Sequence, residues 1–390
     1  MTRRNQEFKP PRILLVTRNL PPLRGGMERL NLHMAFELAK EFRVTVVGPR
    51  GARAFFPAKI SVIEVDAAPL WKFFASALWR SLIAARRTRS DIVLGGSGLV
   101  APFVWLAAKA IGARPALYVH GLDLIAQHPV YRACWLPMIR RANLCFANSR
   151  HTAGLAQKLG VTAIAVVHPG VDLPSRETMA VPNDFRGKFG LGDRPMLLSV
   201  GRLIERKGLL EFVEKAMPQI VAEIPEVRLV VLGDEAPDLL HNNSTRLGGR
   251  IRQRASELGI TRNLCFVGPQ DDATLGKAWG AADAHVFPVR EVPGDVEGFG
   301  MVAVEAAAHG LPTVAFAVGG VPDAVRDGAS GYLIPEGDYA QFASKVIELL
   351  RARDNATLRH SARRFAQAFT WQNFGDAVRG RMRALAEEAK

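Results

Sequence analysis

The chain has 390 residues, more than one hydrophobic core usually serves, so two domains are expected. Its residues are 48% apolar and 23% charged, which excludes a disordered chain and favours a globular one. Three cysteines without metal-ligand spacing predict buried thiols in a reducing compartment. No segment resembles a signal peptide or a membrane-spanning helix, so we expect a cytoplasmic protein. Nothing in the sequence indicates an oligomeric state.

The net charge of +14 is concentrated in one half of the chain. Residues 1–180 carry 25 Lys and Arg against 10 Asp and Glu, whereas residues 181–390 carry 26 against 27. This asymmetry predicts an anionic partner for the N-terminal half. No zinc-ligand set and no RNA- or DNA-reading motif accompanies it, so a membrane surface ranks above nucleic acid.

In chain order, apolar runs typical of buried strands alternate with helical segments, beginning with the helix expected near 27–40. In the first half the strands are expected over 12–17, 43–48, 91–94, 116–120, 144–148 and 163–168. In the second half they are expected over 196–201, 228–233, 264–268, 284–288, 313–317 and 331–335. This alternation predicts an α/β protein with two doubly wound parallel sheets.

The domain boundaries follow from composition. We expect an N-terminal domain over 1–175, a linker over 176–194 and a C-terminal domain over 195–368. The tail predicts two helices broken near Thr370, and a return of the last helix, 369–390, to the first domain is left open.

The segment 71–89 predicts an amphipathic helix with two different faces. A narrow apolar stripe is expected to pack in the core, formed by Trp71, Phe74, Leu78 and Leu82. The second face mixes basic and bulky apolar side chains, as in helices that rest on anionic lipid: Lys72, Trp79, Arg80, Ile83, Arg86 and Arg87. A solvated basic face with Trp79 packed on a neighbour accounts for the pattern as well.

Several motifs fall at predicted strand ends, where open parallel sheets bind ligands. Gly25 and Gly26 precede a helix, so backbone N–H groups there can approach a phosphate, although a simple turn is equally compatible. Arg202 and Lys207 can clamp a diphosphate, with Arg206 between them expected to be exposed.

Two histidines also lie at strand ends. His120 stands near Asp123, and this polar pair has a functional or a structural interpretation. His168 lies where the chain leaves the first domain, which favours a hinge role. No nucleophile elbow or paired cysteine supports Ser-His-Asp or Cys-His catalysis.

The segment 297–305 is the most informative one. Glu297 and Glu305 flank a Gly-Phe-Gly turn that opens a helix. A helix start suits an anion, while carboxylates accept hydrogen bonds from hydroxyls. A nucleotide sugar fits this combination, with its diphosphate at the helix start, its hexose hydroxyls on Glu297 and its ribose hydroxyls on Glu305.

In these motifs, followed by Gly319-Gly320-Val-Pro-Asp, almost the whole chain resembles the retaining glycosyltransferases of family 4, also called group 1. The resemblance implies the GT-B fold, two Rossmann-like domains facing each other across a cleft. It also implies catalytic roles for His120, Arg202, Lys207 and Glu297. Its implied donor-binding residues are Gly25, Gly26, Val267, Gly268, Phe299, Gly300, Met301, Val302 and Glu305. Asp123 is expected on the acceptor side.

The segment 289–300 looks closest to lipid-linked mannosyltransferases. The resemblance therefore implies GDP-mannose as donor, a glycolipid or polyprenyl-linked acceptor, and a peripheral position on the inner face of the cell membrane. It places the chain in polysaccharide or lipopolysaccharide biosynthesis. It also implies retention by front-face attack, with no metal and no cofactor.

Three alternatives remain at this point. One is a UDP-sugar transferase with a soluble acceptor, and another is a catalytically silent binding protein of the same fold. An NAD-dependent dehydrogenase is disfavoured because the chain lacks the Gly-x-Gly-x-x-Gly motif.

Overall fold

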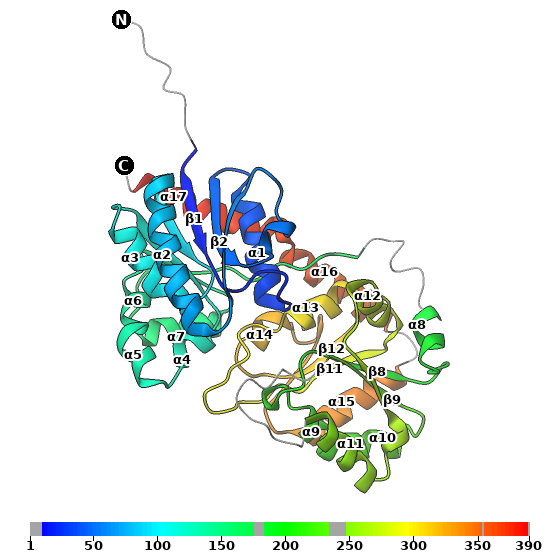
Figure 1. Ribbon diagram of the computed structural model, residues 1–390. Helices are drawn as coiled ribbons and strands as arrows, with labels where there is room; N and C mark the ends of the chain where they lie inside the picture. The colour runs from blue at the N-terminus through cyan, green and yellow to red at the C-terminus, as the bar shows by residue number, and fades with distance from the viewer. Residues whose placement is uncertain (1–9, 175–182, 234–246, 353–354, 389–390) are drawn as a thin grey trace, which may run out of the picture. The chain divides into compact units, whose positions relative to one another are not determined.

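The computed structural model describes residues 10–174, 183–233, 247–352 and 355–388 (Figure 1). The chain forms two compact units: unit 1 comprises residues 1–170 and 371–390, and unit 2 comprises residues 171–370. The C-terminal helix thus belongs to unit 1. Helix α8 (Asn183–Lys188) lies within the stretch expected as a linker, and its Phe185 is buried in unit 2.

Unit 1 is built on a seven-stranded parallel sheet with the order β3-β2-β1-β4-β5-β6-β7. Its strands are β1 (Arg12–Val16), β2 (Arg43–Pro49), β3 (Ser61–Val65), β4 (Ile92–Gly95), β5 (Arg114–Val119), β6 (Leu144–Ala147) and β7 (Ile164–Val166). All the predicted runs are confirmed as strands. The sequence misses only β3, an edge strand whose residues are mostly exposed or half-buried and therefore lack a continuous apolar run.

Helices cover this sheet. They are α1 (Gly26–Leu38), α2 (Leu70–Thr88), α3 (Ala101–Lys109), α4 (Leu122–Ile125), α5 (Pro129–Cys134), α6 (Leu136–Arg140), α7 (Arg150–Lys158) and α17 (Trp371–Glu387). No helix in the described part of the chain is long and apolar enough to cross a membrane.

Helix α2 packs through Phe73 and a row of small residues, and three of the four residues of the predicted apolar stripe lie partly buried beside them. Its buried residues are Phe73, Ala77, Ser81, Ala84 and Ala85. The stripe prediction is wrong for Trp71, which is 67% exposed, whereas Phe74, Leu78 and Leu82 are partly buried beside the core. Alanine and serine let the helix approach its neighbours closely. A prediction based on bulky apolar residues overlooks this effect.

The second face of α2 is open to solvent. Trp79 is 65% exposed, and the four basic residues beside it are all exposed: Lys72, Arg80, Arg86 and Arg87. None of these four cations forms an ion pair with a described residue. The helix therefore presents uncompensated positive charge together with two exposed tryptophans.

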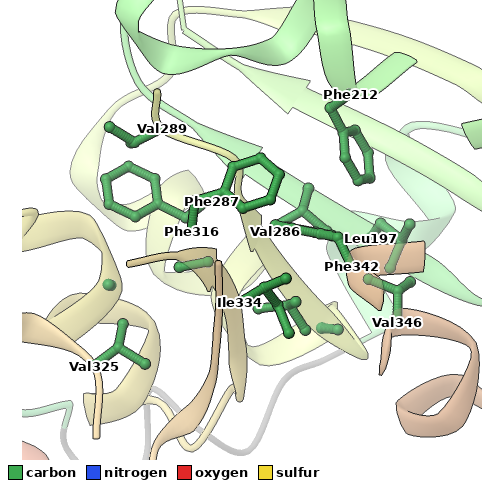
Figure 2. Close-up of a cluster of buried hydrophobic side chains, with 14 of the residues drawn as sticks. Leu197, Phe212, Val286, Phe287, Val289, Phe316, Val325, Ile334, Phe342 and Val346 are labelled. Atoms are coloured by element: carbon green, nitrogen blue, oxygen red, sulfur yellow. The ribbon is translucent and has the colours of Figure 1, made fainter. Parts of the chain in front are cut away.

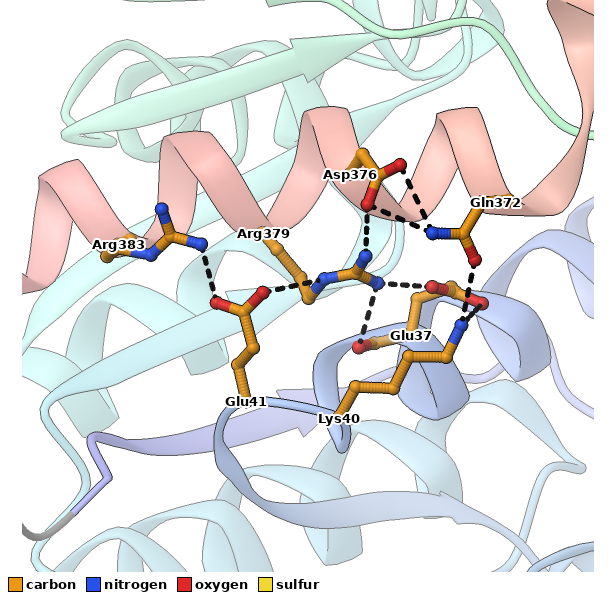
Figure 3. A network of polar contacts seen from close by, with 7 residues as sticks. All are labelled: Glu37, Lys40, Glu41, Gln372, Asp376, Arg379 and Arg383. Carbon is orange, nitrogen blue, oxygen red and sulfur yellow. Dashed lines mark hydrogen bonds and ion pairs between the residues drawn. The ribbon is translucent and has the colours of Figure 1, made fainter.

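Helix α17 docks on α1 through a buried charge network (Figure 3). The Arg379 side chain is 6% exposed and donates to three carboxylates, those of Glu37, Glu41 and Asp376. Glu37 also accepts from Lys40 at 2.6 Å. Arg383 lies 2.7 Å from Glu41 and, with Arg379, lowers the pKa of that carboxyl.

Close approach of the two backbones accompanies this network. A Cβ on Gly375 of α17 would lie 2.0 Å from Glu37 Oε2, so a larger residue here would displace the Glu37 side chain from the network. Phe374, Val378 and Met382 bury the apolar side of α17. The C-terminal helix is thereby an integral part of unit 1.

Unit 2 contains a six-stranded parallel sheet with the order β10-β9-β8-β11-β12-β13. Its strands are β8 (Met196–Val200), β9 (Arg228–Leu232), β10 (Leu264–Gly268), β11 (Ala284–Phe287), β12 (Thr313–Phe316) and β13 (Gly331–Ile334). Besides α8, its helices are α9 (Leu209–Lys215), α10 (Met217–Glu223), α11 (Leu247–Glu257), α12 (Asp272–Ala281), α13 (Met301–Ala308), α14 (Val321–Ala324), α15 (Tyr339–Arg351) and α16 (Ala356–Ala366). All six predicted strands are confirmed, as is the helix break near Thr370.

Three phenylalanines tie the helices of unit 2 to its sheet (Figure 2). The ring of Phe342 from α15 lies 5.3 Å from that of Phe212 on α9 and 5.0 Å from that of Phe316 on β12, both edge-to-face. All three are fully buried. Such pairs add about 0.5–1.5 kcal/mol beyond their area burial, and they hold the strand that leads to the loop at Gly319.

In each sheet successive strands are added first towards one edge and then towards the other, and the two series meet at one point. In unit 1 it lies between the neighbours β1 and β4, and in unit 2 between β8 and β11. Open α/β sheets bind ligands at the carboxyl ends of strands at such points. Gly25 and Gly26 follow β1, Arg202 and Lys207 follow β8, and Glu297 follows β11, whereas His120 follows the neighbouring strand β5.

A buried histidine in β11 predicts how stability depends on pH. His285 is fully buried, Nδ1 lies 3.1 Å from Thr313 Oγ1, and Nε2 has no partner among the described residues. Burial, with a smaller effect of Lys207, lowers the pKa of His285 from 6.5 to about 3. Below pH 6.5 the unfolded chain binds a proton that the native chain does not, so stability should fall by about 1.4 kcal/mol per pH unit.

Urea denaturation of the wild type and of His285→Gln, from about pH 7 to pH 4.5, measures this contribution. In the variant, the free energy of unfolding should fall less steeply as the pH is lowered, because no buried histidine is present at position 285. The same pH dependence in both proteins would contradict the assignment.

Candidate active site

The loop after β8 packs directly on the chain that leaves β11. It ends at Gly208, whose φ of +66° favours glycine. A Cβ there would lie 1.9 Å from the carbonyl oxygen of Pro288. This contact brings Lys207 to the segment that contains Glu297.

Glu297 accepts hydrogen bonds from two cations through a single carboxylate oxygen. Lys207 Nζ lies 2.7 Å from Oε2, and the Arg206 guanidinium donates to the same atom. Arg206 Nε lies 3.0 Å from Asp295 Oδ1. The other oxygen of Glu297, Oε1, has no partner in the part of the chain that the structure describes, so it can accept from a ligand hydroxyl.

Arg206 is buried, and the prediction that it is exposed is wrong. Its side chain is 10% exposed, compared with 18% for Lys207 and 12% for Glu297. The turn Glu205–Lys207 directs it inward towards Asp295 and Glu297. Those partners are about 90 residues away in sequence, and local spacing gives no sign of them.

Burial and charge act on these groups in opposite directions. Burial lowers the pKa of Lys207, and the nearby Glu297 only partly offsets this. For Glu297 burial acts to raise the pKa, but Lys207 and Arg206 together outweigh it and lower the pKa. Glu297 is thus held as a carboxylate, an acceptor for hydroxyl donors.

Arg202 supplies an additional positive charge at this site. It is exposed and makes no ion pair with any described residue. Three cations, Arg202, Arg206 and Lys207, therefore face two carboxylates, Asp295 and Glu297. The excess charge suits an anionic ligand such as a diphosphate.

The backbone after Glu297 is shaped by glycines. Gly300 caps α13 with a φ of +97°. A Cβ on Gly320 would lie 2.0 Å from the carbonyl oxygen of Gly298, and Gly320 N donates to Glu297 O at 2.8 Å. The Gly319-Gly320 pair therefore supports the backbone of Glu297.

The remaining donor-binding candidates of unit 2 lie on the same sheet edge or on α13. Phe299 is buried just before the helix, and Met301 and Val302 form its first turn, where backbone N–H groups lack intrahelical partners. Glu305 lies one turn further along α13. Val267 and Gly268 end β10, and the space beside Gly268 is open.

In unit 1, Gly25 and Gly26 begin α1, as predicted, and a carboxylate lies beside them. Glu28 is 8% exposed, and its Oε1 accepts from Asn19 Nδ2 at 2.8 Å. A Cβ on Gly25 would lie 2.4 Å from Glu28 Oε2. Sequence reasoning missed Glu28, whose partner Asn19 lies nine positions earlier, outside the local helix pattern.

His120 is fixed by its neighbours at the end of β5. Its Nε2 lies 2.9 Å from Gly96 O, and because a carbonyl only accepts, Nε2 is the donor in this bond. Asp123 accepts from the backbone N–H groups of Gly98, His120 and Gly121 at 2.7–3.0 Å. In this structure Asp123 thus positions the loop that carries His120.

Two family models match the chain, one in each half. "Glycosyltransferase Family 4" matches residues 24–174, and "Glycosyl transferases group 1" matches residues 182–368. The chain belongs to this glycosyltransferase family. It is a transferase built on two Rossmann-like parallel-sheet domains.

Relatives of this glycosyltransferase include two mycobacterial enzymes. A GDP-mannose-dependent alpha-(1-6)-phosphatidylinositol monomannoside mannosyltransferase of Mycolicibacterium smegmatis is 29% identical over 92% of the chain and 94% of that protein. A D-inositol 3-phosphate glycosyltransferase of Mycobacterium marinum is 36% identical, but over 55% of the chain. The match spans only 44% of the length of the M. marinum protein.

Solved structures share the fold. Anabaena Alr3699/HepE in complex with UDP has a TM-score of 0.78 at 19% identity and covers 96% of this chain and 100% of its own. WaaG, a glycosyltransferase involved in lipopolysaccharide biosynthesis, has a TM-score of 0.69 at 18% identity, covering 94% and 98%. These likenesses concern the GT-B architecture.

Proposed function

We propose that this glycosyltransferase moves a hexose, with mannose from GDP-mannose as the preferred donor, to a lipid-linked or membrane-associated glycan acceptor with retention of configuration. The cluster around Glu297 carries the proposal, because it combines excess positive charge with a free carboxylate oxygen beside a helix start. The name of the M. smegmatis relative supports the choice of donor and acceptor class.

In the proposed reaction, Arg202 and Lys207 bind the diphosphate and stabilise the charge that develops as it departs. Glu297 Oε1 accepts hydrogen bonds from hexose hydroxyls. The acceptor oxygen bonds to the anomeric carbon on the face from which the diphosphate leaves, and the leaving phosphate takes the acceptor proton. No enzyme carboxylate forms a covalent intermediate, and positive side chains take the place of a metal.

Glu297→Gln tests this mechanism. The amide keeps the shape but removes the charge that orders the hexose, so kcat should fall by about 10- to 100-fold while GDP binding persists. Steady-state kinetics and calorimetric titration with GDP measure the two effects. A glycosyl ester trapped on any carboxylate, detected by mass spectrometry with donor alone, would refute the front-face mechanism.

The donor is tested by thermal stabilisation with GDP-, UDP-, ADP- and dTDP-sugars. A ligand at 100 times its Kd should contribute about 2.7 kcal/mol, and a selective response to GDP-mannose is expected. A selective UDP-sugar response would instead favour the UDP-dependent enzyme with a soluble acceptor, and no response would favour the silent binding protein. Activity should persist in EDTA.

The exposed face of α2 supports a peripheral position on an anionic membrane. Its unpaired cations and the exposed Trp79 combine charge attraction with interfacial aromatic burial. Flotation with vesicles containing anionic lipid should retain the wild type and release a variant with Lys72, Arg80, Arg86 and Arg87 changed to glutamine. Failure of the wild type to float at low salt would remove the membrane from the proposal.

A further inference from the structure

The proposed function gives Lys207 two tasks that compete for its single charge. It is expected to bind the donor diphosphate, yet in this structure its ammonium donates to Glu297 Oε2 at 2.7 Å. Its charge also lies 4.7 Å from the centre of the Phe287 ring. A buried carboxylate left without a cation is costly, so Lys207 is free to serve phosphate only if Glu297 keeps another counter-ion.

Arg206 meets this requirement. It donates to the same oxygen of Glu297, and Asp295 holds its guanidinium from a second side at 3.0 Å. A planar guanidinium fixed between two carboxylates stays in place, whereas the flexible lysine carries a point charge with three donors that can turn towards a phosphate. The two cations therefore differ in how readily they can be shared with a ligand.

We propose that Arg206 is the resident counter-ion of Glu297, a positioning residue that leaves the charge of Lys207 available for the donor diphosphate. This inference rests on the proposed function. When nucleotide binds, Lys207 turns its remaining donors to the diphosphate, and Arg206 keeps Glu297 ionised and in place for the hexose. Without Arg206, Lys207 becomes the main counter-ion of Glu297 and binds phosphate less well.

The test is a double-mutant cycle read by calorimetric titration with GDP, using UDP where the panel selects it. Arg206→Met should weaken nucleotide binding by about tenfold or more, because Lys207 is retained by Glu297. The double variant Arg206→Met/Glu297→Gln should recover an affinity within a few-fold of Glu297→Gln alone, since no carboxylate then competes for the lysine. A residue with only a structural role would show no such rescue.

Two controls complete the design. Arg206→Lys keeps the positive charge but loses the two-sided fork and should bind nucleotide with intermediate affinity, even if the methionine variant folds poorly. Arg254→Met removes a half-buried arginine on α11 that also pairs with two carboxylates, those of Glu214 and Glu257, and should bind as the wild type does. Wild-type affinity in both Arg206 variants, or a double variant as weak as Arg206→Met, would overturn the inference. If the wild type binds no nucleoside diphosphate, the proposed function itself fails.

Discussion

Replacing Arg379 with methionine is expected to destabilise unit 1 by about 3–5 kcal/mol, because it leaves the buried Glu37 carboxylate without its main counter-ion. Glu37 is 8% exposed in its side chain, and Lys40 would be its remaining cation. Chemical denaturation followed by fluorescence measures the loss. The unfolding of unit 1 should then separate from that of unit 2, because α17 belongs to unit 1 alone.

Matched variants show whether the buried charge is the cause. Arg383→Met removes the ion pair between Arg383, on the same helix, and Glu41. The two side chains are 56% and 36% exposed, so the loss should cost no more than about 1 kcal/mol of stability. Adding Glu37→Gln to Arg379→Met should return part of the stability, because the unpaired charge is then gone. Equal losses for Arg379→Met and Arg383→Met would contradict this account.

Loss of either predicted diphosphate ligand should have the largest effect on the reaction. Arg202→Met and Lys207→Met should each lower kcat/KM by about 10² to 10³, equivalent to about 3 kcal/mol of transition-state stabilisation. Nucleotide release with GDP-mannose and a lipid acceptor provides the measurement. The charge that develops on the departing diphosphate is the physical reason.

The two variants should differ in the absence of nucleotide. Arg202 is exposed and makes no ion pair among the described residues, so its replacement should leave the thermal midpoint unchanged. Lys207 is paired with the buried Glu297, so its replacement should lower the midpoint as well. An Arg202 variant that turns over at the wild-type rate would remove this residue from the site, with Arg254→Met as the surface control.

Local patterns were sufficient to predict most of the fold. Buried parallel strands need apolar side chains on both faces, and runs such as those of β1 and β8 are therefore visible without any structure. The edge strand β3 was missed because an edge strand does not need that pattern. Helix α2 was predicted as a helix, but its packing face was predicted only in part, because the small residues that allow close approach do not stand out in an apolar pattern.

Within the site, the types of side chain available at each strand end could be predicted from the sequence. The glycines before helices, the cations after β8 and the Glu297 carboxylate before α13 can all be recognised from neighbouring residues in the sequence. The pairing of these groups could not be predicted, because it depends on which segments the fold brings together. Arg206 becomes buried because Asp295 and Glu297, about 90 residues away, meet it where β8 and β11 are neighbours. Likewise, Arg379 pairs with Glu37, which is 342 positions away in the sequence. A charged side chain is buried only where partners are available, and here the fold supplies a partner from a distant segment.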